Sequence, residues 1–64
     1  MYTVEHLKTG HIYYVVNDNV INATNHDDGV IMVLYVNTDN MCFVRERNEF
    51  WQKFRRQDDS EGKA

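Results

Sequence analysis

The chain has 64 residues, a net charge of −3 and a hydrophobic content of 42%. A chain of this length forms one small core and leaves no room for a second lobe that would enclose a catalytic cleft. The acidic net charge also argues against the broad basic surface that a non-specific nucleic-acid binder needs. We therefore expect a single small domain that is not an enzyme.

The single cysteine, Cys42, cannot form a disulfide within the chain. Small domains from oxidising compartments usually carry several disulfides, so a lone cysteine indicates a reducing cytosol. No stretch approaches the roughly 20 apolar residues of a membrane span, and the first residues lack the basic and apolar regions of a signal peptide. The sequence thus predicts a cytoplasmic protein with no membrane partner.

The first part of the chain predicts strands separated by turns. Residues 3–7 alternate weakly and are expected to form a short edge strand. Residues 8–10 end in glycine and predict a turn. Residues 11–16 and 20–24 are rich in β-branched and aromatic residues, which favour strands. Between them, residues 17–19 (Asn-Asp-Asn) predict a bulge or a tight turn.

The clearest turn signal is at residues 25–29, which end in Asp-Gly. Residues 30–36 are all apolar and include several β-branched residues. This run is too short for a typical helix, so it predicts a central strand that is covered on both faces. Residues 37–40 predict another turn, and residues 41–44 predict a strand that forms a hairpin with 30–36. Cys42 lies in this last strand, where we expect it to be a small buried apolar residue.

The pattern becomes helical after residue 44. Aromatic side chains recur at i, i+1 and i+4, namely at Phe50, Trp51 and Phe54. We expect a short helix or 3₁₀ turn at residues 46–52, capped by Asn48, and then a last short strand near residues 53–56.

Short strands at regular spacing, with turn signals between them, are typical of a small all-β domain. Four or five strands favour an SH3-like barrel with a short C-terminal helical turn, because closing the sheet protects its edges. The alternative is an α+β fold in which one C-terminal helix covers a small antiparallel sheet. We expect residues 1–56 to form the domain and residues 57–64 to form a disordered acidic tail.

Three motifs resemble those of a known family. Residues 6–15 (HLKTGHIYYV) are similar to H-x-K-x-G-x-x-Y-x-V, residues 33–35 to a V-V-Y strand, and residues 43–54 to an aromatic-x-R…F…F ending. Together they resemble short bacterial and phage proteins classed as a domain of unknown function. The match covers residues 6–54, with Glu46 where the family commonly has proline and a slightly longer segment between the first two motifs. The resemblance implies a small SH3-like β-barrel and a phage or bacterial origin, and it carries no known activity.

Candidate residues for chemistry are scattered along the sequence. Three histidines and Cys42 would satisfy zinc in number, but their spacing matches no zinc motif. Cys42 lies in an apolar strand, where neither a base nor a cleft would activate it. Most of the aspartates of the first 44 residues lie in predicted turns, where they favour local backbone hydrogen bonds. We therefore expect no catalytic residue, no metal site and no cofactor.

Charged and aromatic side chains concentrate between residues 44 and 56, which contain five of the seven basic residues and three of the eight aromatic residues. In the strand at 11–16, alternation places Tyr13 and Tyr14 on opposite faces, so one of them is expected to be exposed. Exposed Tyr or Trp beside Arg is typical of binding hot spots. The alternative is that Trp51 only covers one end of the barrel, while the Arg and Lys side chains extend into water. The predicted binding residues, here called the aromatic-basic strip, are Arg45, Arg47, Trp51, Lys53, Arg55, Arg56 and Tyr14.

Within this strip, Arg45 follows an apolar strand and matches the arginine of the family's last motif. We favour a structural ion pair between Arg45 and a turn carboxylate over a role in anion binding. The sequence supports two functions. The first is a non-catalytic module that binds a host or cellular protein through the aromatic-basic strip. The second is a small nucleic-acid-binding barrel. The chain is expected to be a monomer or a homodimer paired through edge strands.

Overall fold

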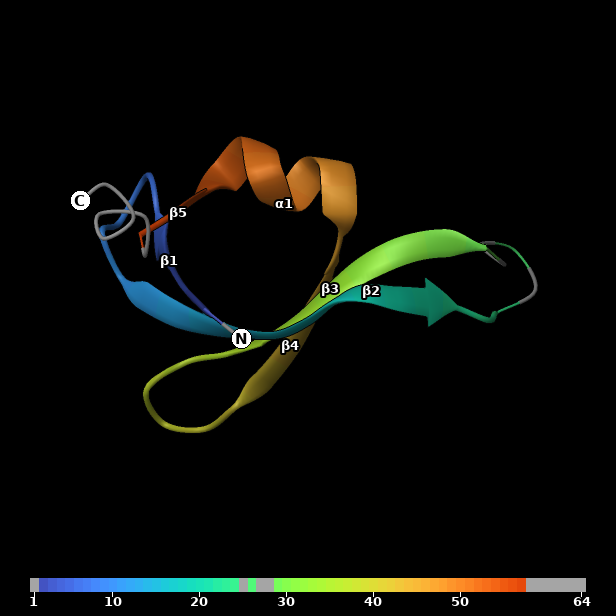
Figure 1. Cartoon of the computed structure of the whole chain (residues 1–64), viewed down its shortest axis with the longest axis horizontal. Helices are drawn as coiled ribbons and strands as arrows, with labels where there is room; N and C mark the ends of the chain where they lie inside the picture. Colours follow the sequence, from blue (N-terminus) through green and yellow to red (C-terminus); the bar gives the residue numbers. More distant parts are fainter. Residues whose placement is uncertain (1, 25, 27–28, 58–64) are drawn as a thin grey trace.

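The computed structural model describes residues 2–24, 26 and 29–57. Five strands and one short helix follow one another along this part of the chain, and Figure 1 shows how they are arranged. They are β1 (Tyr2–His6), β2 (Ile12–Asn22), β3 (Val30–Val36), β4 (Cys42–Glu46), α1 (Arg47–Lys53) and β5 (Phe54–Arg56). The strands form one antiparallel sheet in the order β4-β3-β2-β1-β5.

The prediction of a small, mostly β domain with a short C-terminal helix is confirmed. The sheet is not closed into a barrel, because β4 and β5 are its two edges and they do not pair with each other in the described chain. The helix α1 links these two edges and lies over one face of the sheet (Figure 1). Among the described residues, the three residues of β5 pair with β1 alone, which leaves no second ladder to complete a barrel.

The first strand was predicted to lie at an edge, and this prediction is wrong. β1 lies between β2 and β5, with Val4 opposite both Tyr13 and Arg56. Val4 is fully buried, because neighbours on both sides enclose it. The backbone N–H of Gln57 donates to the Thr3 carbonyl at 3.0 Å, so the first residue of the predicted tail still pairs with β1. Residues 58–64 of that tail lie outside the described residues.

The predicted interruption of the second strand is confirmed as a bulge. β2 is one strand of 11 residues, and its register against β3 shifts twice between Val15 and Val20. Within the bulge, the Asn17 side-chain oxygen accepts a hydrogen bond from the Asn19 backbone N–H at 2.8 Å. A bulge increases the local bend and twist of a strand. The first half of β2 therefore joins β1, while its second half runs with β3 as a two-stranded arm (Figure 1).

The other predicted turns agree with the structure wherever it describes them. Gly10 has φ +78° in the turn before β2. In the β3–β4 hairpin, the Asn37 side-chain oxygen accepts from the N–H groups of Asp39 and Met41, both at 2.9 Å, and Asn40 adopts φ 67°. Three residues of the predicted turn at 25–29 lie outside the described residues.

One buried cluster of three valines and three aromatic residues forms the core between the sheet and α1. Its members are Val4, Val15, Val33, Tyr35, Phe50 and Phe54. The rings of Phe50 and Phe54 stack at 4.2 Å, and the Tyr35 ring meets both of them edge-on. Burial of side chains of this size contributes about 1.5–3 kcal/mol each. The spacing of Phe50 and Phe54 in the sequence indicated that they belong to the core, and both side chains pack there.

Two predictions of burial are wrong for one reason. In β3, Val33 and Tyr35 are buried, whereas the residues of the opposite face are only partly covered. Cys42 is exposed in β4 rather than buried. In the described chain the single helix covers one face of the sheet, so the other face keeps its apolar residues at the surface.

The first turn of α1 is capped by Glu46, whereas the sequence had suggested Asn48. The two carboxylate oxygens of Glu46 accept from the backbone N–H groups of Asn48 and Glu49, at 2.9 and 3.0 Å. These hydrogen bonds favour the charged carboxylate and lower the pKa of Glu46. A helix N-terminus has unsatisfied N–H donors, and here Glu46 satisfies two of them.

Candidate protein-binding surface

Two arginines of the aromatic-basic strip form ion pairs with carboxylates of the same chain. Arg45 lies 3.2 Å from the Glu49 carboxylate and donates a hydrogen bond to the Tyr35 hydroxyl at 3.4 Å. The hydrogen bond to Tyr35, aided by the charge of Glu49, raises the pKa of Arg45. Arg55 lies 3.4 Å from the Glu5 carboxylate of β1. The predicted ion pair of Arg45 therefore exists, but its partner is on the helix and not in a turn.

Arg56 and Trp51 of the strip both contact Tyr2, a residue that the sequence did not single out. The guanidinium carbon of Arg56 lies 3.9 Å from the centre of the Tyr2 ring, and that ring stacks on Trp51 at 6.2 Å. The Tyr2 hydroxyl donates to the Asp18 carboxylate at 2.6 Å. Because Tyr2 precedes a weakly alternating strand and its partners are far away in the sequence, no local pattern indicated this stack.

The last two basic residues of the strip, Arg47 and Lys53, are exposed at the two ends of α1. Neither forms an ion pair with a carboxylate of the described chain. The five basic groups thus divide between the helix, the β1–β5 edge and the stack on Tyr2. Of the five, Arg55 alone lies on the same face of the sheet as Tyr14, opposite Glu5 of β1.

The face of the sheet opposite the core, here called the outer face, is largely apolar over β2, β3 and β4, and carries the Glu5–Arg55 ion pair over β1 and β5. The register places Tyr14, Val36 and Cys42 in one row across β2, β3 and β4, and it places Leu34 beside Val44 in the next row. Tyr14 is 44% exposed and Val44 is 56% exposed. Soluble proteins seldom leave a large contiguous apolar patch uncovered without a binding role.

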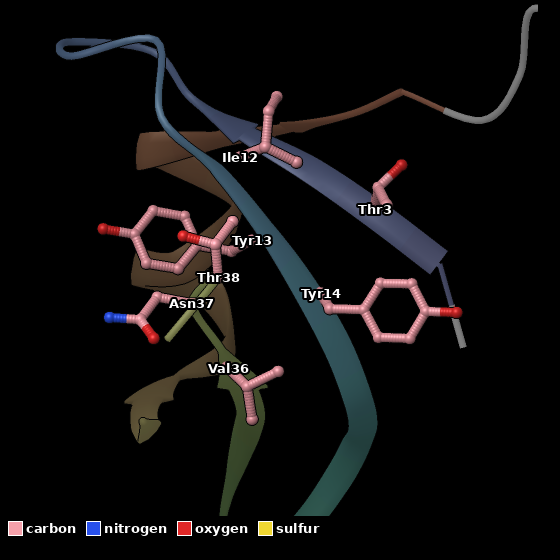
Figure 2. Close-up of a pocket in the computed structure, with 7 residues that line it drawn as sticks. All are labelled: Thr3, Ile12, Tyr13, Tyr14, Val36, Asn37 and Thr38. Atoms are coloured by element: carbon pink, nitrogen blue, oxygen red, sulfur yellow. The ribbon is translucent and has the colours of Figure 1, made fainter. Parts of the chain in front are cut away.

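Two adjoining pockets form a groove between the start of β2 and the turn after β3. Its apolar end is an open pocket of about 250 Å³, and its residues are Thr3, Ile12, Tyr13, Tyr14, Val36, Asn37 and Thr38. Figure 2 shows the Tyr14 ring on one side of this pocket and Asn37 and Thr38 on the other, with Val36 between them. A second pocket continues the groove past His11 and Asp39.

The chemistry of this pocket suits apolar contact. Among the residues that the structure describes, its lining has hydroxyl and amide groups but no carboxylate, amine or guanidinium. Of its residues, the sequence had singled out Tyr14 as a binding residue. Ile12 could also have been found, because it alternates with Tyr14 along the strand, whereas Val36 lies in the run that was expected to be buried.

No family model matches this chain, and neither the curated proteins nor the solved structures include a match. Among residues 2–24, 26 and 29–57, no three His, Cys, Asp or Glu side chains lie close enough together to hold a metal ion. The described helix is too short and too polar to cross a bilayer. The candidate site is therefore argued from the outer face itself.

Proposed function

We propose that this chain is a small, non-catalytic protein-binding module of a phage or bacterial cytoplasm. The observation that carries this proposal is the apolar pocket beside the exposed Tyr14 on the outer face. The family resemblance supports the origin, and a small five-stranded antiparallel sheet with one short helix is consistent with it. This proposal moves the binding surface from the aromatic-basic strip as a whole to its member Tyr14.

The pocket fits an apolar side chain of a protein partner. Tyr14 offers a rigid ring that an apolar group can pack against, together with a hydroxyl that can stay hydrogen-bonded at the rim, and such residues dominate hot spots. Ile12 and Val36 supply apolar walls, while Asn37 and Thr38 supply hydrogen-bonding groups at the opposite side. An apolar centre with a polar rim is the usual anatomy of a protein interface.

A comparative pull-down tests this function. The tagged wild-type chain and a Tyr14→Asp variant are incubated with nuclease-treated lysate of a bacterial host. We expect Tyr14→Asp to lose a protein that the wild type retains, with affinity falling about tenfold or more for a hot-spot change. Ile21→Asp is the matched control, because Ile21 is 52% exposed on the same strand but away from the pocket. Equal recovery by wild type and Tyr14→Asp would argue against the proposal.

A second candidate function, nucleic-acid binding, is favoured by the Arg56–Tyr2–Trp51 stack. Trp51 is 38% exposed and stacks on Tyr2, over whose ring the Arg56 guanidinium lies, and bases stack on such aromatic groups in single-strand binders. If the chain binds nucleic acid, fluorescence anisotropy with single-stranded DNA should show binding that weakens as the salt rises from about 50 to 200 mM. The Trp51→Ala substitution should also reduce this binding. An unchanged anisotropy at the lowest salt would exclude this function.

A further inference from the structure

In the described chain, the first residues of β2 have a neighbouring strand on one side only. β2 pairs with β3 from Tyr14 onward, where Tyr14 lies opposite Val36, and β3 ends at Val36. The chain then turns toward β4, and the Asn37 N–H donates to the Met41 carbonyl at 3.1 Å. The groove therefore lies where the start of β2 has no strand beside it, between Ile12 and this turn.

The ladder with β1 determines which backbone groups of β2 face the groove. The His6 N–H donates to the His11 carbonyl at 2.9 Å, so these two residues form a hydrogen-bonded pair. Antiparallel strands alternate hydrogen-bonded and non-hydrogen-bonded pairs. Ile12, opposite Glu5, therefore directs its N–H and C=O away from β1 and toward the groove. Neither group has a hydrogen-bond partner among residues 2–24, 26 and 29–57.

An extended chain segment can satisfy both of these groups. In antiparallel pairing, one residue both donates its N–H and accepts through its C=O opposite a single residue of the neighbouring strand. A residue that pairs with Ile12 in this way uses both free groups, whereas a parallel strand would need two residues to do so. Paired side chains share one face of a sheet. The side chain opposite Ile12 therefore enters the apolar pocket beside Tyr14 and Val36.

The other end of the groove carries a negative charge. The second pocket, of about 440 Å³, includes His11 and Asp39 in its lining. With histidine counted as neutral, Asp39 is the one formal charge among the described lining residues. Its carboxylate forms no ion pair or hydrogen bond with a described residue. A segment antiparallel to β2 runs from Tyr14 toward His11, so a basic side chain that meets Asp39 follows the apolar one in its sequence.

We propose that the groove binds an extended segment of a protein partner, in which an apolar residue is followed within two positions by lysine or arginine. This inference rests on the protein-binding function proposed above and adds the chemistry of the partner. The apolar side chain fills the pocket beside Tyr14, its backbone pairs with Ile12, and the basic group lies against Asp39. In such strand addition, main-chain hydrogen bonds give affinity and side-chain pockets give specificity.

The C-terminal tail of this chain does not have the chemistry of such a segment. Residues 58–64 contain three acidic residues and no large apolar residue. The tail therefore has the same sign of charge as Asp39 and nothing to fill the apolar pocket. A second copy of this chain is the remaining alternative, and the experiment below separates it from a partner.

Peptide titration of the whole chain, followed by proton–nitrogen correlation NMR, tests the proposal. The probe is acetyl-Thr-Thr-Leu-Lys-Lys-amide, in which threonine favours an extended chain. Added up to about 5 mM, which detects millimolar binding, it should shift the amide signals of Ile12, Thr38 and Asp39. The signal of Ile21, outside the groove, should stay unchanged. Absence of the three shifts would overturn the proposal, and the same shifts on concentrating the protein alone would assign the groove to a second copy.

Two changes in the probe test the charge and the backbone separately. Glutamate in place of both lysines should weaken binding, because it brings like charges to Asp39. N-methylation of the leucine removes the donor to the Ile12 carbonyl and should raise the dissociation constant about three- to tenfold. Equal binding of the glutamate probe would contradict the charge contact. Equal binding of the N-methylated probe would contradict the strand pairing.

Two variants of the protein test whether Asp39 itself attracts the probe. Asp39→Asn should raise the dissociation constant about two- to fivefold, as loss of an exposed ion pair does. Glu49→Gln is the matched control, because it makes the same change in net charge on α1, outside both pockets. We expect Glu49→Gln to bind the probe like the wild type. Equal weakening by the two variants would attribute the effect to net charge and overturn the role of Asp39.

The pull-down described above separates this proposal from the function on which it rests. Asp39→Lys should reduce recovery of the protein that Tyr14→Asp loses. If Tyr14→Asp loses that protein and Asp39→Lys retains it fully, the chain is a protein-binding module but the apolar–basic segment is wrong. If Tyr14→Asp retains it as the wild type does, the protein-binding function itself is contradicted.

Discussion

Arg45 joins the sheet to the helix. Its guanidinium contacts both the Tyr35 hydroxyl in β3 and the Glu49 carboxylate in α1. The sequence correctly suggested a structural ion pair at this position, because the arginine ends an apolar strand. The identity of the partner could not be predicted, since it depends on where the helix begins and on which face it turns to the sheet.

Removing this link should weaken the fold modestly. We expect Arg45→Ala to lower the free energy of unfolding by about 1 kcal/mol, since a half-exposed ion pair contributes little and the packed stem adds to it. Arg45→Met keeps most of the stem and should lose less. Urea denaturation followed by circular dichroism measures both variants. A larger loss in Arg45→Met than in Arg45→Ala would contradict this role.

Glu46 gives the fold a pH dependence. Its pKa is lowered in the folded state, so its contribution to stability is present above the ordinary carboxyl pKa and is lost as the pH falls through the lowered value. Glu46→Gln should therefore melt at a lower temperature than the wild type at pH 7, and the difference should shrink in acid. Thermal denaturation across pH 2–7 measures this.

Asn48→Ala is the matched control, because the sequence favoured Asn48 as the cap and the structure assigns the cap to Glu46. We expect Asn48→Ala to change the melting temperature less than Glu46→Gln, and equally at all pH values. Asn and Glu lie two residues apart in this segment, and the sequence alone could not determine which of them ends β4. A greater loss for Asn48→Ala would assign the cap to Asn48.

At the scale of elements, the helix α1 contributes to stability mainly through one residue. Phe50 is fully buried and lies against the rings of Tyr35, Trp51 and Phe54. Phe50→Ala should cost about 3–5 kcal/mol, as large-to-small changes in a core do. A domain of this size has about 3–10 kcal/mol in total, so we expect most of this variant to be unfolded at 37 °C.

Circular dichroism at 37 °C measures the effect of Phe50→Ala. Trp51→Ala is the control on the neighbouring position, and it should cost less because Trp51 is partly exposed. If Trp51→Ala proved the more damaging of the two, the core would be centred on Trp51 and not on Phe50.

The elements themselves were largely predictable from local patterns. Runs of β-branched, aromatic and other apolar residues predicted most of the strands, and Gly10 and Asn40 lie at turns that need positive φ. The position of β1 in the sheet was not predictable, because its second neighbour is β5, about fifty residues away along the chain. Pairing between such distant segments leaves no local signal in a single sequence.

At the scale of the molecule, a single short helix covers one face of the described sheet. The aromatic core packs beneath α1, while Ile12, Tyr14 and Val44 of the other face remain exposed. Of the candidate site, the sequence could predict the exposure of one of the adjacent tyrosines. It could not predict the groove, because an uninterrupted apolar run such as residues 30–36 does not tell which of its faces is covered.

The outer-face pocket is the central claim, and site-specific photo-crosslinking tests it most directly. A photoreactive phenylalanine derivative replaces Tyr14 in one variant and Ile21 in another, and both are irradiated in host cells. We predict a covalent adduct with one protein partner from position 14 and none from position 21. The same adducts from both positions, or no adduct from position 14, would contradict a binding site at this pocket.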